Sequence, residues 1–142
     1  MMPWHPIAIH FPIALLTAAV VVDVIAVLRC RDNALHRIAY ALLVAGTIGA
    51  GASVLSGNAD AADYRQTPVA AAIQDHEDLG TATFLLFLML VLARLPRILR
   101  PPPKVGKAWV WLLPAVVGLV LLLFTSYHGG ELVYVKGVGV NH

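Results

Sequence analysis

The chain is poor in charge. Only 13% of its 142 residues are Asp, Glu, Lys or Arg, whereas 59% are hydrophobic. Soluble domains carry about 25% charged residues, so this composition excludes a globular protein whose whole surface faces water. The formal net charge is only +2, and the basic residues lie in short clusters beside apolar runs. We therefore expect no nucleic-acid partner.

The sequence also has little cysteine and none of the common catalytic motifs. Its one cysteine, Cys30, excludes both an intramolecular disulfide and a paired-cysteine metal site. There is no nucleophile elbow, phosphate-binding loop or His-Glu-x-x-His pattern, so hydrolysis and nucleotide chemistry have no support. The first twelve residues hold no Lys or Arg, and we expect them to belong to the mature protein.

What the sequence does have is four long apolar runs, at Ile7–Leu28, Leu35–Leu55, Leu79–Leu95 and Ala108–Tyr127. Runs of about 17 to 22 residues match a bilayer core of roughly 30 Å when they are helical. In lipid every backbone polar group must be paired within its own segment, which excludes isolated strands. The sequence therefore predicts an all-α integral membrane protein. We expect one domain, an up-down four-helix bundle over residues 1–142.

Basic residues distinguish the two ends of this predicted bundle. Most Lys and Arg residues lie between the first and second spans or between the third and fourth, at Arg29, Arg31, Arg37, Arg94, Arg97, Arg100, Lys104 and Lys107. The connection over residues 57–78 is acidic instead and holds one arginine, Arg65. The positive-inside rule places the basic loops in the cytoplasm, so we expect both termini on the non-cytoplasmic side.

The histidines gather on that non-cytoplasmic side. Only His36 falls in a predicted cytoplasmic loop; the other five are His5, His10, His76, His128 and His142. Histidine is the commonest metal ligand, and ionisable residues at membrane depth point to function because lipid makes them costly. Interfacial histidines also anchor helix ends or bond nearby carbonyls, and this alternative stays open for each of them.

His10 and His76 are the preferred ligand pair, because the first and third helices are diagonal in an up-down bundle. A bis-histidine b-type haem fits between such residues. Gly80, one turn from His76, predicts a notch for a porphyrin edge, although glycines also let helices pack closely. His128 is a third candidate ligand. Arg65 is a candidate partner for the haem propionates, with a surface ion pair to Asp63 as the alternative.

Asp23 lies inside the first span, where a carboxylate costs about 2.5 to 3.5 kcal/mol on insertion scales. We expect it to face protein and to make a helix-packing hydrogen bond or pair with a cytoplasmic arginine. Its position is about 140° around the helix from His10, so the two side chains do not line one pocket.

Three segments together resemble one known family: His5-Pro-Ile-Ala-Ile-His-Phe-Pro-Ile-Ala-Leu-Leu16, His76-Glu-Asp-Leu-Gly80, and Gly129-Gly-Glu-Leu-Val-Tyr134 with Gly137-Val-Gly-Val140. The chain resembles the small predicted bacterial membrane proteins grouped as domain of unknown function 2231. The resemblance covers the whole chain and implies a four-helix domain of the bacterial inner membrane, with no settled activity. His5, His10 and His76 match histidines of the family pattern, whereas Lys136 replaces a common histidine.

Three functions remain open at this point. The first is electron transfer by a b-type haem near the periplasmic face, within a membrane electron-transfer complex or with a periplasmic redox partner. The second is a cofactor-free accessory subunit of a larger respiratory or photosynthetic complex. The third is a copper or zinc site made by His5, His10 and His76 with a carboxylate, because imidazole suits both metals.

Overall fold

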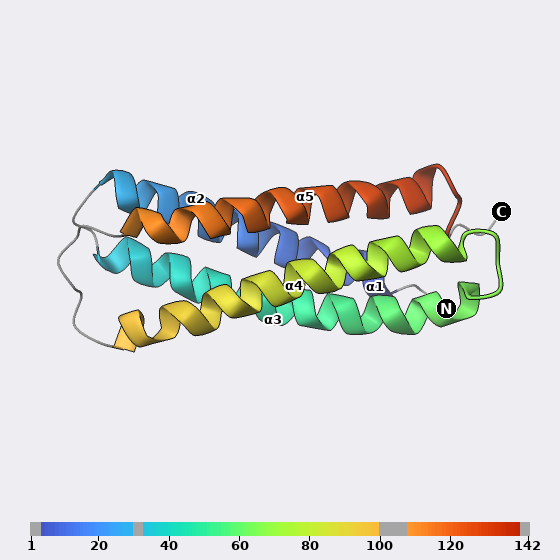
Figure 1. The fold of residues 1–142 in the computed structure, drawn as a ribbon, viewed down its shortest axis with the longest axis horizontal. Coiled ribbons are helices and arrows are strands. Elements are labelled where there is room, and N and C mark those ends of the chain that lie inside the picture. The colour runs from blue at the N-terminus through green and yellow to red at the C-terminus, as the bar shows by residue number, and fades with distance from the viewer. Residues whose placement is uncertain (1–3, 30–32, 100–107, 140–142) are drawn as a thin grey trace.

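The structure, a computed structural model, describes residues 4–29, 33–99 and 108–139. Its elements are α1 (Trp4–Ala8), α2 (His10–Leu28), α3 (Asn33–Ala61), η1 (Ala62–Tyr64), α4 (Ala70–Leu99), η2 (Ala108–Trp111) and α5 (Leu112–Tyr134). Figure 1 shows four long helices side by side along the long axis of the molecule. Cys30, Arg31, Arg100, Lys104, Lys107 and His142 lie outside the described residues.

The described chain contains four helices that are long and apolar enough to cross a membrane. They correspond to the four predicted apolar runs, so the all-α prediction and the predicted number of spans agree with the structure. Three helices extend beyond their apolar runs: α3 continues to Ala61, α4 begins at Ala70, and α5 continues to Tyr134. Hydropathy marks the part of a helix that suits lipid, whereas the helical hydrogen bonds continue into the polar ends.

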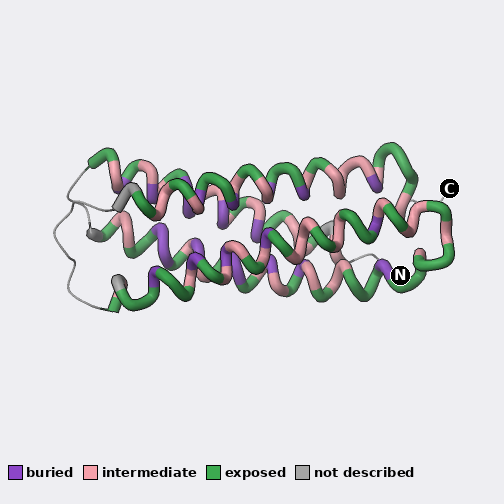
Figure 2. Tube along the Cα trace, viewed as in Figure 1, coloured by how far each residue is buried: buried purple, intermediate pink, exposed green. Residues whose placement is uncertain are grey.

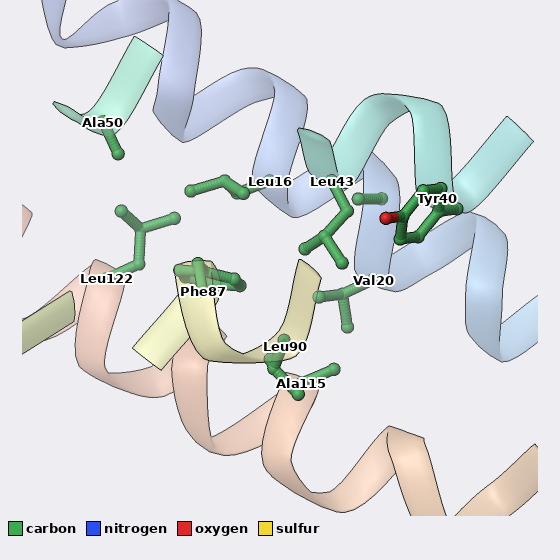
Figure 3. Close-up of a cluster of buried hydrophobic side chains, with 10 residues drawn as sticks. Leu16, Val20, Tyr40, Leu43, Ala50, Phe87, Leu90, Ala115 and Leu122 are labelled. Atoms are coloured by element: carbon green, nitrogen blue, oxygen red, sulfur yellow. The ribbon is translucent and has the colours of Figure 1, made fainter. Parts of the chain in front are cut away.

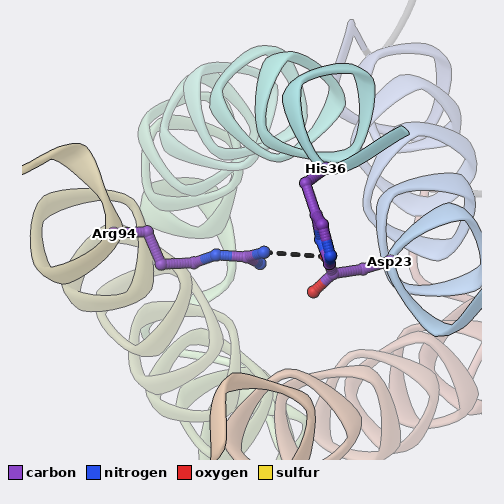
Figure 4. Close-up of polar contacts among 3 residues, drawn as sticks. All are labelled: Asp23, His36 and Arg94. Carbon is purple, nitrogen blue, oxygen red and sulfur yellow. Dashed lines mark hydrogen bonds and ion pairs between the residues drawn. The ribbon is translucent and has the colours of Figure 1, made fainter. Parts of the chain in front are cut away.

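Consecutive helices are neighbours in space. α2 packs against α3, α3 against α4 and α4 against α5, and α5 closes the ring against α2. Seen along the bundle axis, α2 and α4 therefore lie diagonally opposite each other (Figure 4). This is the up-down arrangement that short connections predict.

An apolar layer fills the middle of the bundle. It includes Leu16 and Val20 of α2, Leu43 of α3, Phe87 of α4 and Leu122 of α5, all buried (Figure 3). Exposed residues occur along the whole length of the bundle (Figure 2), and many of them are large and apolar. Helices surrounded by lipid are expected to have a hydrophobic outer surface as well as a hydrophobic core, because their outer faces contact lipid chains and not water.

The two ends of the bundle differ in composition. One end, here called the histidine end, contains α1, the carboxyl ends of α3 and α5, and the start of α4, and both chain termini are marked at this end in Figure 1. The other, the arginine end, contains Arg29, Arg37 and Arg94. The structure thus places both termini at the same end, as predicted, and which aqueous phase that end faces stays a prediction.

Residues 135–139, after α5, fold back over the histidine end. Gly137 and Gly139 adopt positive φ angles of 69° and 75°, which allow the reversal. The Gly139 N–H donates to the Tyr64 hydroxyl at 3.1 Å. Beneath it, Leu132 packs with Ala61 and Ile73 in a second small apolar cluster.

Candidate functional site

Two histidines from different helices meet at the histidine end. His5 lies in α1 and His76 lies two turns into α4, and their ring centroids are 6.2 Å apart at an interplanar angle of 80°. Both side chains are partly buried. α1 packs against α3 at the histidine end, and the His5–His76 contact brings α1 close to α4 as well.

The His5 imidazole is oriented by α3. Its Nδ1 lies 2.9 Å from the Ser53 carbonyl oxygen and 3.2 Å from the Ser56 hydroxyl oxygen. A carbonyl only accepts, so Nδ1 carries the proton and donates, and Nε2 keeps its lone pair. Metal-binding histidines commonly have their second nitrogen held by such an outer partner, which sets the tautomer and the ring orientation.

Each imidazole lies against a glycine of a neighbouring helix. A Cβ placed on Gly57 of α3 would be 2.9 Å from Cε1 of His5, and a Cβ on Gly129 of α5 would be 2.9 Å from Cε1 of His76. Real Cβ atoms essentially never come that close. The absence of a side chain at these two glycines is therefore what makes room for the two rings.

The surroundings of the pair contain polar atoms without partners. His76 Nδ1 and Ser53 Oγ are buried and have no hydrogen-bond partner among the described residues. Farther into the bundle, the Thr83 and Thr125 hydroxyls bond each other at 3.0 Å. Buried polar atoms are usually paired, so the unpaired ones beside the imidazoles favour a site that takes up a further group.

His10 does not join this pair, contrary to the sequence prediction. It is exposed on α2, whereas Pro12 and Leu16 are buried on the core face. Pro12 is two positions after His10, which is about 200° around a helix. His10 therefore points away from the core face on which Pro12 lies. His5 is seven residues before Pro12, nearly two full turns, and this spacing was the sequence signal that favours His5 over His10.

The other predicted site residues lie beside the pair but do not complete it. The His128 Nδ1 donates to the Phe124 carbonyl oxygen at 3.1 Å, and its ring packs against the Phe124 ring of the same helix, with centroids 4.3 Å apart and planes tilted by 56°. Gly80 meets only Val54, at 4.0 Å from the position of a Cβ. Arg65 is exposed and lines a surface cavity of about 400 Å³.

The predicted copper or zinc cluster of His5, His10 and His76 with a carboxylate is not formed. In residues 4–29, 33–99 and 108–139, no three His, Cys, Asp or Glu side chains come together as a metal-ion group. The physical reason is the outward rotation of His10, which leaves two imidazoles in the site.

A second polar cluster lies at the arginine end. Asp23 of α2 is buried, and its Oδ1 accepts hydrogen bonds from Arg94 Nη2 at 2.8 Å and from His36 Nδ1 at 2.9 Å. Figure 4 shows Arg94 reaching from α4 across the bundle to Asp23, with His36 beside it from α3. The Asp23 Oδ2 is buried and has no hydrogen-bond partner among the described residues.

This cluster confirms one prediction and corrects another. Asp23 faces protein and pairs with an arginine of the basic group, as expected. His36 is not in a loop: α3 begins at Asn33, so His36 is helical and bonded to Asp23. Sequence reasoning missed the bond to Asp23 because no local pattern links His36 to a residue of the preceding helix.

Comparison with known proteins gives one match. The family described as "Predicted membrane protein (DUF2231)" matches residues 1–142. No curated protein matches the chain. No solved structure matches it either.

Proposed function

The chain belongs to this family of predicted membrane proteins, and from that premise we propose that it is a membrane-embedded electron carrier in which His5 and His76 ligate the iron of a b-type haem. The haem supplies the chemistry, because its iron accepts and gives up one electron. The protein supplies two imidazoles, their orientation and a lipid-surrounded bundle.

The observation that carries the proposal is the distance between the two rings. Metal–imidazole bonds are about 2 Å long, so two rings on opposite sides of one metal have centroids roughly 6 to 6.5 Å apart. The centroids of His5 and His76 are 6.2 Å apart. His76 Nδ1 has no hydrogen-bond partner among the described residues and would be the nitrogen that this ring offers to the metal.

The way in which the rings are held also supports ligation. His5 has its Nδ1 bonded to α3, which leaves Nε2 for the metal. His76 is backed by Gly129, and the Gly80 position beside it has no neighbour closer to a Cβ than Val54, at 4.0 Å. Two imidazoles that are already held in position would lose little entropy when the cofactor binds.

The proposal includes a location and a partner. The positive-inside rule favours a cytoplasmic arginine end, so the haem would lie near the periplasmic face of a bacterial inner membrane. An electron carrier at that face exchanges electrons with a periplasmic redox protein or with other subunits of a membrane electron-transfer complex. The lipid-facing apolar helices are the contact with the bilayer.

The test is the visible absorption spectrum of the full-length protein, purified from a haem-replete host, before and after reduction with dithionite. We expect b-type haem bands in the unmodified protein and their loss in His5→Ala and in His76→Ala. His10→Ala and His128→Ala are matched controls at the same end of the bundle, and both should keep the bands.

Two results would contradict the proposal. The first is an unmodified protein that folds and carries no haem bands even after haem is added. The second is retention of unchanged bands in both His5→Ala and His76→Ala, which would exclude this ligand pair.

A second candidate is one copper ion between the same two imidazoles. It is favoured by the packing at Gly57 and Gly129, because the two rings themselves fill the space beside these glycines and a single ion needs less room than a porphyrin. Imidazole is a suitable copper ligand. Elemental analysis decides between the candidates. One copper per chain without haem bands supports the copper ion. The absence of both copper and haem iron supports the cofactor-free accessory subunit.

A further inference from the structure

The Asp23–His36–Arg94 cluster is separate from the histidine pair. Eighteen residues of α4 separate His76 from Arg94, which is roughly 27 Å along a helix. The apolar layer around Leu16, Leu43 and Phe87 fills the bundle between them. What the cluster does is therefore independent of whether a metal binds at the other end.

The hydrogen bonds define the protonation of His36. The Asp23 Oδ1 accepts from Arg94 and also lies 2.9 Å from His36 Nδ1. An ionised carboxylate only accepts, so the proton of neutral His36 is on Nδ1, and Nε2 carries a lone pair. A carboxylate that holds one imidazole nitrogen fixes the tautomer and stabilises the imidazolium that forms when the other nitrogen gains a proton.

Exposure differs among the three members. The Asp23 side chain is 2% exposed and the Arg94 side chain 10%, whereas that of His36 is 26% exposed. His36 also lies three residues after the start of α3, at the end of the bundle. A proton from the adjacent aqueous phase can thus reach the imidazole, whereas the Asp23 carboxylate is buried and not in contact with water.

The charges of the cluster balance before a proton is added. Arg94 compensates Asp23, so the cluster is neutral with neutral His36 and carries one positive charge when Nε2 is protonated. Around it, Arg29 and Arg37 are exposed at the same end, and Tyr40 donates to the Val91 carbonyl oxygen. In the described part of α5, titratable side chains occur only toward the other end, at Tyr127, His128, Glu131 and Tyr134.

We infer that the Asp23–His36–Arg94 cluster is a proton-binding site, in which Nε2 of His36 takes a proton from the aqueous phase at the arginine end and returns it to the same phase. The proton comes from hydronium or a buffer acid, the Nδ1–H···Asp23 bond persists, and no group is oxidised or reduced. Arg94 donates to the same Asp23 oxygen, and the Asp23 carboxylate stabilises the imidazolium.

The test is ¹⁵N NMR of full-length protein labelled at the histidine rings, in lipid nanodiscs, with His36→Gln used to assign the His36 signals. We expect one protonated nitrogen, Nδ1, at about pH 8, and a second, Nε2, after acidification to about pH 5. In Asp23→Asn the preference for the Nδ1–H tautomer should be lost, and in Asp23→Glu it should be retained.

Tyr40→Phe is the control for indirect effects, because it removes the neighbouring α3–α4 hydrogen bond and leaves both hydrogen bonds to Asp23 in place. It should leave the His36 spectrum unchanged. A His36 signal that stays singly protonated from about pH 8 to about pH 5 would overturn the inference and leave a purely structural ion pair. An Nε2–H tautomer of the neutral His36 ring in the unmodified protein would overturn it as well.

Discussion

Single glycines decide where the imidazoles lie. Gly57 and Gly129 come from different helices, and each leaves space for a ring that a methyl group would occupy. A glycine inside a helix costs about 1 kcal/mol relative to alanine, so its presence at these two positions needs a packing reason. The contacts with His5 and His76 supply that reason.

Replacing Gly129 with alanine should displace the His76 ring. The new Cβ would lie 2.9 Å from Cε1, which forces the imidazole or α5 to move. Overpacking of this kind costs about 1 to 3 kcal/mol, partly offset by the higher helix propensity of alanine. We expect a lower unfolding temperature in detergent and weaker cofactor binding in a haem titration.

The adjacent Gly130→Ala is the matched control, because a Cβ there meets nothing within 4 Å. Its unfolding temperature should stay the same or rise, with unchanged cofactor binding. Equal effects of the two substitutions would show that helix propensity, and not the contact with His76, determines the result.

At the scale of elements, α2 and α3 form the tightest contact through small residues. Gly46 of α3 lies against Leu16 of α2, with a Cβ position 2.7 Å from Leu16 Cγ and 3.1 Å from its backbone nitrogen. Gly49, one turn later, lies against Pro12 with ordinary contact distances from 3.4 Å. Small residues let membrane helices approach closely, and this explains Gly46 and Gly49 of α3.

Gly46→Ala should therefore push α2 away from α3. Because the obstacle includes the backbone of α2, a side-chain rotation alone does not relieve it. We expect a loss of about 1 to 3 kcal/mol in unfolding free energy, measured by denaturation in mixed micelles. Gly49→Ala should change it by less than about 1 kcal/mol, and a larger loss at Gly49 than at Gly46 would contradict the packing described above.

At the scale of the whole molecule, the bundle has two different ends separated by an apolar layer. Both termini and the histidine pair lie at one end, and the Asp23 cluster lies at the other. Positive charge in the arginine-end connections predicts which end stays in the cytoplasm. The candidate redox site and the candidate proton site therefore lie at opposite ends of the bundle.

Cysteine labelling in spheroplasts of a bacterial host tests this orientation. Gln66 is exposed between η1 and α4, and Gln66→Cys combined with Cys30→Ser should react with a membrane-impermeant maleimide in intact spheroplasts. The unmodified chain, whose one cysteine is Cys30 in the connection after α2, should react only after lysis. The reverse pattern would place the histidine end in the cytoplasm.

Much of the architecture could be predicted from the sequence, because hydropathy over some twenty residues is a property of each segment alone. The number of spans, the diagonal placement of α2 and α4 and the inward orientation of Asp23 follow from span length, short connections and the cost of a charge in lipid. His10 was predicted as the partner of His76 from its depth in the membrane alone. The rotation of α2 about its axis, which turns His10 outward, was not known from the sequence.

By itself, then, the sequence determined four membrane-type helices, their order around the bundle and a histidine-rich end. Tertiary structure alone decided that His5 and not His10 meets His76, and that His36 and Arg94 share one oxygen of Asp23. The reason is that a helix's apolar length is encoded locally, whereas its rotation is set by contacts such as Leu16 against Gly46, between residues far apart in the chain.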